Sequence, residues 1–180
     1  GTTTLAGDVS ATGNQTYTGA VTLAKNAVLQ STGANATIAV ANSINSDSAA
    51  NRTLNISASG AGSTVSLGGA VGASNVLSQV NVTGATIALN GGTVNTSGNQ
   101  TYAGAVTLGA ATTLPASNVT TTTGSTVAGA SNSLNVTGNA SLGGDVSDVS
   151  SIGVSGTTTL AGDVSATGNQ TYTGAVTLAK

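Results

Sequence analysis

The sequence predicts an all-β fold, a parallel β-solenoid with triangular coils of roughly 18–22 residues, and three observations support this prediction. Gly, Thr, Ser, Asn and Val are abundant and form helices poorly, whereas Thr and Val favour the pleated surface of a sheet. Charged residues make up only 4% of the chain, which is unlike a disordered protein. The sequence also repeats, on three different length scales.

The longest repeat is a segment that occurs twice without a change. Residues 1–25 and 156–180 are identical, so the period is 155 residues. We expect residues 1–155 to be one tandem repeat unit and residues 156–180 to be the start of the next. The chain has neither an initiator Met nor an apolar signal stretch, so we expect it to be an excerpt of a longer array.

A shorter repeat divides this unit. GNQTYAGAVTL at 98–108 matches GNQTYTGAVTL at 13–23 and at 168–178. Differences between the aligned parts are concentrated in Gly-, Ser- and Asn-rich stretches, as expected of surface loops. The sequence therefore predicts two unequal half-units, roughly 30–108 and 109–178.

The finest repeat has six residues. The chain begins GTTTLA GDVSAT GNQTYT GAVTLA KNAVLQ, with a glycine opening each of the first four blocks. Apolar or aromatic residues favour the third and fifth positions, which point to the same side of a strand. Each block is therefore predicted to be a short strand of about four residues with a glycine-containing corner. The same phase returns at 92–115 and at 156–180.

Strands this short do not form stable isolated hairpins, but stacking can stabilise them. If three blocks form one coil, each strand pairs with strands of the coils above and below, and inward aliphatic side chains form ladders. At about 4.8 Å per coil, one unit would give ~8 coils and ~38 Å of rod. Glycine follows the fifth-position residue by two places, as in Leu5-Ala6-Gly7, and the six-residue phase breaks between about 30 and 91. Both features favour a right-handed over a left-handed solenoid.

The composition argues against most enzyme chemistry. The chain has no His and no Cys, so it lacks an imidazole base, a thiolate and the usual zinc ligands. We therefore expect no enzymatic activity, no cofactor and no metal. Three cations, Lys25, Arg52 and Lys180, are too few to bind nucleic acid. No stretch approaches the length of apolar residues that a membrane-spanning helix needs.

Two acidic features could suggest a site, and both are disfavoured. Gly143-Gly144-Asp145 is one fragment of a calcium-binding solenoid repeat, but it is not repeated in the other half-unit, where Ala70 follows the two glycines. Asp145 and Asp148 could form a carboxylate pair for hydrolysis. The pair occurs once in the unit, and nothing in the sequence predicts a pocket for a substrate, so a solvated corner is favoured.

The three GNQTY segments, with Leu-Gly-Gly at 67–69 and 142–144, resemble the repeats of giant filamentous-haemagglutinin-like adhesins of Gram-negative bacteria. The resemblance implies two-partner or autotransporter-type export, an extracellular or cell-surface location, and a right-handed β-helical shaft. The shaft would give reach and stiffness. Its partners would be neighbouring repeats of the same chain, laterally associated rods and, through regions outside this sequence, other cell surfaces or glycans.

The GNQTY segments are also the best-marked candidate site. In a functional interpretation, Asn14, Asn99 and Asn169 would be glycan acceptors or ligand contacts. In the structural interpretation, which we favour, the asparagines occupy corners and the tyrosines point inward. The residues of this structural repeat motif are Gly13, Asn14, Gln15, Tyr17, Gly19, Val21, Leu23, Gly98, Asn99, Gln100, Tyr102, Gly104, Val106, Leu108, Gly168, Asn169, Gln170, Tyr172, Gly174, Val176 and Leu178.

Two other functions stay open. A self-associating extracellular fibre or sheath without an adhesive role is compatible with low charge and exposed solenoid ends. An ice-binding solenoid would need a regular array of threonines on one face. The sequence contains Thr-x-Thr pairs such as Thr2/Thr4, Thr16/Thr18 and Thr121/Thr123. We do not expect these pairs to recur at a fixed coil spacing on one face.

Overall fold

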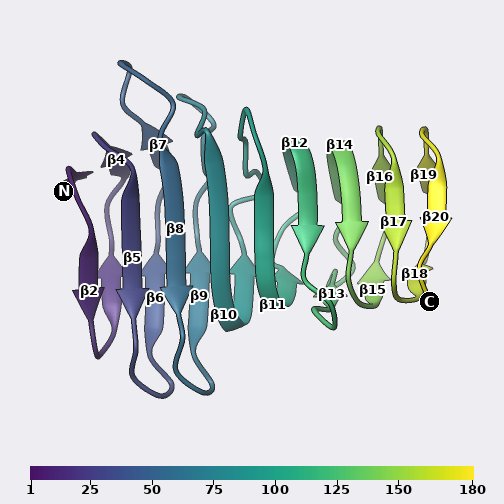
Figure 1. The fold of residues 1–180 in the computed structure, drawn as a ribbon, viewed down its shortest axis with the longest axis horizontal. Coiled ribbons are helices and arrows are strands. Elements are labelled where there is room, and N and C mark those ends of the chain that lie inside the picture. The colour runs from purple at the N-terminus through teal and green to yellow at the C-terminus, as the bar shows by residue number, and fades with distance from the viewer.

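The computed structural model describes residues 1–180 and contains strands and loops but no helix. The strands stand side by side along the long axis, with the N-terminus at one end and the C-terminus at the other (Figure 1). Neighbouring strands pair in parallel, and the chain winds into a β-solenoid of about 8 turns. The predicted fold class is confirmed, and right-handed winding stays a prediction.

Each turn has three strand segments, and the segments of successive turns form three files, which we name face one, face two and face three. Face one contains β1 (Thr3–Leu5), β4 (Val21–Leu23), β7 (Ile44–Ser46), single bridges at Val71 and Val94, the first halves of β12 (Thr112–Thr121) and β14 (Leu134–Leu142), β16 (Ile152–Val154) and β19 (Gln170–Tyr172). Face two contains β2 (Val9–Ala11), β5 (Ala27–Ser31), β8 (Thr53–Ala58), the first halves of β10 (Gln79–Leu89) and β11 (Gln100–Leu108), the second halves of β12 and β14, β17 (Thr158–Leu160) and β20 (Val176–Leu178). Face three contains β3 (Gln15–Tyr17), β6 (Thr37–Val40), β9 (Thr64–Leu67), the second halves of β10 and β11, β13 (Val127–Ala128), β15 (Val146–Val149) and β18 (Val164–Ala166).

Coil length varies because loops are inserted at the corners. Thr3 pairs with Val21, 18 residues later, and Ile152 likewise pairs with Gln170. The longest coil runs from Ile44 to Val71, which is 27 residues and exceeds the expected range. Its extra residues form the loops between β7 and β8 and between β8 and β9, which project from the shaft in Figure 1. The strands of this coil keep their register with the coils on either side.

The core is one continuous ladder of aliphatic side chains inside the solenoid. A cluster of 35 buried residues extends from Leu5 to Leu160. On face three, one ladder of partners in register consists of Ile38, Val65, Ile87, Val106, Val127 and Val146. Burying a side chain of this size contributes about 1.5–3 kcal/mol, so each coil stabilises its neighbours through both backbone pairing and apolar contact.

Asn and Asp side chains take over hydrogen bonding at the corners, where the backbone leaves the strand ladder. Their Oδ1 atoms accept an N–H of the next coil at 2.8–3.0 Å. The corner residues, each followed by the residue whose amide it accepts, are Asp8 (Val28), Asn14 (Thr37), Asn26 (Thr53), Asn139 (Thr157) and Asp145 (Asp163). These exposed bonds give backbone amides near the corners a protein partner in the preceding coil.

Four strands depart from the expectation of short, separated segments. β10, β11, β12 and β14 have 11, 9, 10 and 9 residues and continue around a corner. In β11 and β14 the bend lies at Gly104 and Gly138, whose φ angles are +145° and +135°. Residues with a Cβ rarely adopt such angles, so glycine lets the strand turn without ending. The prediction of uniformly short strands is wrong for these four.

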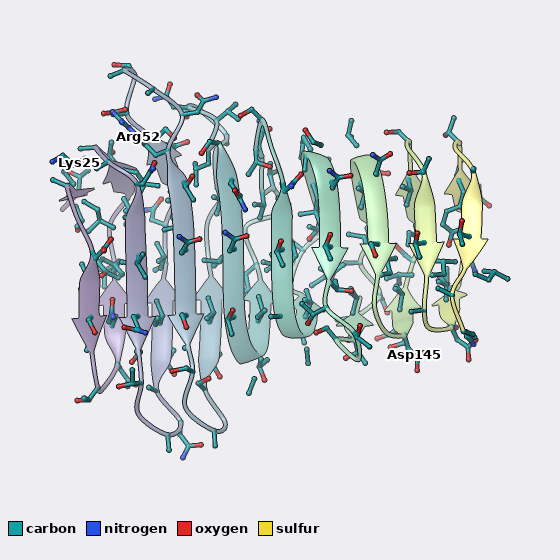
Figure 2. All side chains as sticks on the ribbon, in the orientation of Figure 1. Lys25, Arg52 and Asp145 are labelled. Carbon is teal, nitrogen blue, oxygen red and sulfur yellow. The ribbon has the colours of Figure 1, made fainter.

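Charged side chains are sparse along the whole shaft (Figure 2). No group of three or more acidic, His or Cys residues is placed to hold a metal ion. The protein also has no helix that is long and apolar enough to cross a membrane. The outer surface of the shaft is therefore mainly formed by neutral polar side chains.

Candidate functional site

The three GNQTY segments each cover one corner of the solenoid. We name residues 13–23 copy one, residues 98–108 copy two and residues 168–178 copy three. In each copy a Gln-Thr-Tyr strand leads to a glycine corner, and a Val-Thr-Leu strand follows on the next face. In copy one these strands are β3 and β4, in copy two they are the halves of β11, and in copy three they are β19 and β20.

The Gln and Tyr of the motif form a buried hydrogen-bonded pair, best seen in copy two. Gln100 Nε2 donates to Val94 O at 2.6 Å and to Pro115 O at 2.9 Å. Tyr102 Oη donates to Gln100 Oε1 at 2.9 Å. Val94 lies before the corner and Pro115 lies one coil further on. The carboxamide therefore ties two coils together from inside the shaft.

Copy one repeats this arrangement with the same residue spacing. Gln15 Nε2 reaches the carbonyl of Val9, six residues earlier, at 3.4 Å and that of Gln30, 15 residues later, at 2.5 Å. Tyr17 Oη donates to Gln15 Oε1 at 2.9 Å. The Gln side chain is thus a recurring link between corners, which the periodic pattern of apolar residues does not reveal.

Copy three keeps two of these three contacts. Gln170 Nε2 donates to Val164 O, again six residues earlier, at 3.3 Å. Tyr172 Oη donates to Gln170 Oε1 at 3.2 Å. Copy three lies in the last coil of residues 1–180, where Gln170 has no carbonyl of a later coil within reach. The Tyr–Gln bond and the bond from Gln to the earlier carbonyl therefore form without a following coil, whereas the bond from Gln to the later carbonyl needs one.

Burial changes the acid–base behaviour of the motif tyrosines. Tyr102 is only 1% exposed, and its removal from water raises the pKa of the phenol far above its ordinary value. Burial also raises the pKa of Tyr17 and of Tyr172. The phenols therefore stay protonated in ordinary solution conditions and act as hydrogen-bond donors to the glutamines.

The second glycine of each copy allows two coils to touch at the corner. A Cβ on Gly104 would run into the carbonyl oxygen of Gly84 in the preceding coil. The equivalent glycines, Gly19 and Gly174, lie against the Gly1 and Gly156 carbonyls in the same way. The first glycine is less uniform. A Cβ on Gly98 or Gly168 would lie 2.6 Å from a serine carbonyl oxygen, whereas Gly13 has open space.

The Val and Leu of the motif belong to the core wherever another coil covers them. Val21, Leu23, Val106 and Leu108 are at most 3% exposed. In copy three, Val176 is 44% exposed and Leu178 is 75% exposed. The motif therefore supplies an apolar ladder that depends on the following coil.

The asparagines of the motif lie at corners, and two of them bond to the next coil. Asn14 accepts the Thr37 amide, as described above. Asn99 Oδ1 accepts from Asn118 Nδ2 at 2.9 Å, and Asn118 Oδ1 accepts from Asn139 Nδ2 at 3.1 Å. The last two bonds form an amide ladder on the surface that sequence analysis missed. The spacings of 19 and 21 residues within it follow no fixed period, so the sequence carries little signal for it.

Asn169 lies beside an open hollow on face one. Gly153 and its neighbours in register, Asn135 and Thr171, line this hollow. Thr173 also lines it. These groups are neutral hydroxyls and amides, which can form hydrogen bonds.

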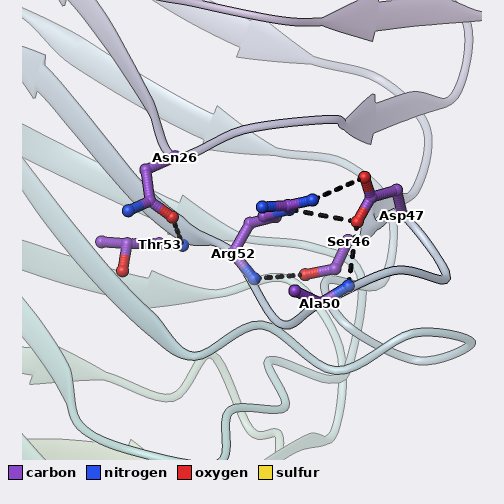
Figure 3. A network of polar contacts seen from close by, with 6 residues as sticks. All are labelled: Asn26, Ser46, Asp47, Ala50, Arg52 and Thr53. Atoms are coloured by element: carbon purple, nitrogen blue, oxygen red, sulfur yellow. Dashed lines mark hydrogen bonds and ion pairs between the residues drawn. The ribbon is translucent and has the colours of Figure 1, made fainter.

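The one arginine forms an ion pair that holds the loop at residues 47–52 (Figure 3). Arg52 donates from Nη2 to Asp47 Oδ2 at 2.8 Å and from Nε to Asp47 Oδ1 at 3.0 Å. The Arg52 amide also donates to Ser46 Oγ at 2.8 Å. The guanidinium lowers the pKa of Asp47 below its ordinary value, chiefly through its hydrogen bonds. This pair closes a surface loop and leaves no free charge to bind a ligand.

Fold and corner geometry together define the class of the protein as a parallel β-solenoid of stacked three-segment coils. No family model, no curated protein and no solved structure matches the chain. Its class is therefore defined by the fold alone.

Proposed function

We propose that this chain is a stretch of a structural shaft built from tandem copies of a 155-residue unit. The observation that carries the proposal is that residues 1–25 and 156–180 are identical and both lie in one solenoid with a continuous core. Each coil presents strand edges and a partly covered apolar ladder to the next. Addition of a further unit therefore needs no new kind of contact.

The surface chemistry supports a mechanical function. The candidate site residues contribute buried hydrogen bonds, close glycine contacts and apolar ladders between coils. Solvent-facing side chains are mainly Thr, Ser and Asn, with few charges. A rod with this surface can extend from a cell and resist bending, because every coil is held by backbone pairing to both neighbours. We propose no enzymatic activity and no cofactor for it.

A chain of two units provides the direct test of the shaft. We expect the rod to lengthen by ~35 Å per added unit at a constant cross-section, since seven coils of about 4.8 Å are added with one further strand. Small-angle X-ray scattering of the 180-residue chain and of a chain extended by one unit would measure both dimensions. A cross-section that grows while the length stays constant would contradict the proposal.

The resemblance of the GNQTY repeats supports a more specific proposal, that the shaft belongs to a filamentous-haemagglutinin-like protein at the surface of a Gram-negative bacterium. Antibodies against the loop at residues 47–52, imaged by electron microscopy on intact cells, would test this location. Single thin rods that extend outward would support an adhesin shaft. Regular bundles would favour a self-associating fibre or sheath, and labelling only after lysis would contradict both.

One structural feature favours a second candidate, ice binding. The Thr-x-Thr pairs noted above do lie on different faces, with Thr4 in β1 and Thr16 in β3. Face two, however, carries a file of outward residues in register, namely Thr101, Thr120, Ser141, Thr159 and Thr177. Ice crystals grown with the protein would test it, because an ice-binding face alters crystal shape and replacing Thr120 with Lys should abolish the effect. Unshaped crystals would remove this candidate.

A further inference from the structure

The two identical segments of the sequence occupy different faces of the solenoid. Thr3–Leu5 forms β1 on face one and stacks on β4 and then β7. Its copy, Thr158–Leu160, forms β17 on face two, between the second half of β14 and β20. The same residues therefore point in a different direction from the shaft 155 residues later.

The register explains this displacement. Along face one, seven coil steps lead from β1 through β4, β7, Val71, Val94, β12 and β14 to β16. β17 is the next segment after β16, one face further round. The 155-residue period therefore contains seven complete coils and one additional face. It is not a whole number of turns.

The GNQTY motif tolerates this displacement because it specifies a corner and not a face. The Gln-Thr-Tyr strand lies on face three in copy one, on face two in copy two and on face one in copy three. In every copy the Gln side chain still reaches the carbonyl six residues earlier, and the Tyr hydroxyl still bonds to the Gln. Each of the three corners thus accepts the same sequence.

We infer that successive units of this protein are related by a screw, in which each unit begins one face further round the shaft than the unit before it. The inference rests on the proposed tandem array, but it does not depend on export or adhesion. Features that occur once per unit would then point in three directions in turn. They would return to the same direction only at every third unit.

The loop at residues 47–52 occurs once per unit, and the screw would turn it to a different side of the shaft in each successive unit. It projects at the corner between face one and face two, closed by the Asp47–Arg52 ion pair. In the following unit it would project between face two and face three. A partner that recognises the loop could approach the shaft from any side, and an array would present it to several partners at once.

The screw also opposes side-by-side bundling of rods. Two rods that pack through one face can align a given pair of contacts only at every third unit. Because such a contact recurs only at every third unit, lengthening the array adds little to the free energy of lateral association. The displacement therefore favours single rods over regular sheaths.

Distances between spin labels on the 180-residue chain would test the screw. The protein has no cysteine, so cysteines introduced on its outer surface are labelled selectively. Thr4→Cys/Thr159→Cys places labels at equivalent positions of the two identical segments. Ser10→Cys/Thr159→Cys places them on the same face, seven coils apart or ~34 Å. We expect the distance to be several ångströms longer for the equivalent pair than for the same-face pair.

The opposite order of the two distances would overturn the inference, because equivalent positions would then share a face. A third variant, Ser141→Cys/Thr159→Cys, joins residues in register one coil apart. It should show the strong dipolar broadening of adjacent labels, and its absence would also overturn the inference. Either outcome would leave the shaft proposal intact if scattering still showed growth in length per unit, so the two failures are distinguishable.

Discussion

Copies two and three of the motif differ only at Ala103 and Thr173, yet their environments are very different. Copy two pairs with β10 on one side and with β12 and β13 on the other, and Leu108 is 1% exposed. Copy three pairs only with β16 and β17, and Leu178 is 75% exposed. Both copies place a Gln-Thr-Tyr segment and a Val-Thr-Leu segment on either side of a glycine corner, although copy two is one continuous strand bent at Gly104 and copy three is two separate strands. Its stability therefore comes from the adjoining coils, as expected of a solenoid held by nearest-neighbour contacts.

Truncation of the motif tyrosine is expected to produce the largest difference between the two copies. Tyr102→Ala would remove a side chain that the core surrounds completely, and should lower the free energy of unfolding by about 4 kcal/mol. Tyr172→Ala should lower it by less than ~1 kcal/mol, because this ring is only partly covered. Urea unfolding followed by circular dichroism would measure both. Equal losses would show that the motif carries its own stability.

Removal of the motif glutamine should have the next largest effect. Gln100→Ala would leave the Val94 carbonyl and the Tyr102 hydroxyl buried without the Gln100 side chain, whereas the Pro115 carbonyl keeps the Thr96 amide, and the loss should cost about 3 kcal/mol in total. Gln170→Ala is the matched control, and its expected cost is at most ~0.5 kcal/mol. The same urea titration serves for both. A small loss for Gln100→Ala would mean that water replaces the carboxamide inside the shaft.

Two glycine substitutions compare a corner that is packed against the preceding coil with a corner that has open space. Gly104→Ala would force a Cβ toward the Gly84 carbonyl at a φ of +145°, and should cost about 2 kcal/mol. A Cβ on Gly13 would meet no other heavy atom within 4 Å, so Gly13→Ala should change stability by less than ~0.5 kcal/mol. Thermal unfolding of the two variants would show the difference. Similar melting temperatures would contradict the close approach of coils at this corner.

The smallest effect is expected at the loop outside the motif. Arg52 lowers the pKa of Asp47, so the ion pair stabilises the loop at pH values above the ordinary Asp pKa of about 3.9 and is lost as pH falls through the lowered value. Carbon NMR of the Asp47 carboxyl would follow this titration. Arg52→Gln should raise the midpoint toward the ordinary value and leave the urea midpoint of the shaft nearly unchanged. An unchanged carboxyl midpoint would contradict the pairing.

The fold was predictable from sequence because the six-residue pattern, with glycines at the block openings and apolar residues such as Leu5, Val21 and Leu23 between them, indicates where strands lie, where the chain turns and which side chains point inward. The face that each segment occupies was not predictable. All three faces alternate inward and outward residues in the same way, so the pattern does not indicate which face a given segment occupies. Loop insertions also change coil length without changing the pattern, and this hid both the displacement of the repeat and the continuous bent strands.

The candidate site was predictable only in part. The repeats identified the corner residues and the tyrosines, but a Gln side chain that reaches across a corner has no periodic signature. Contacts such as Gln100 to Pro115 depend on where the next coil passes, which the local sequence does not determine. The Asn99–Asn118 bond was hidden for the same reason.

Amide hydrogen exchange in the unmodified chain tests the central claim most directly, namely that adjoining coils stabilise a motif whose two copies differ at a single residue. One experiment reports on copies two and three together, because both occur in the same molecule. We predict slow exchange for the strand amides of copy two and exchange at least tenfold faster for those of copy three. Equal protection of the two copies would contradict the account.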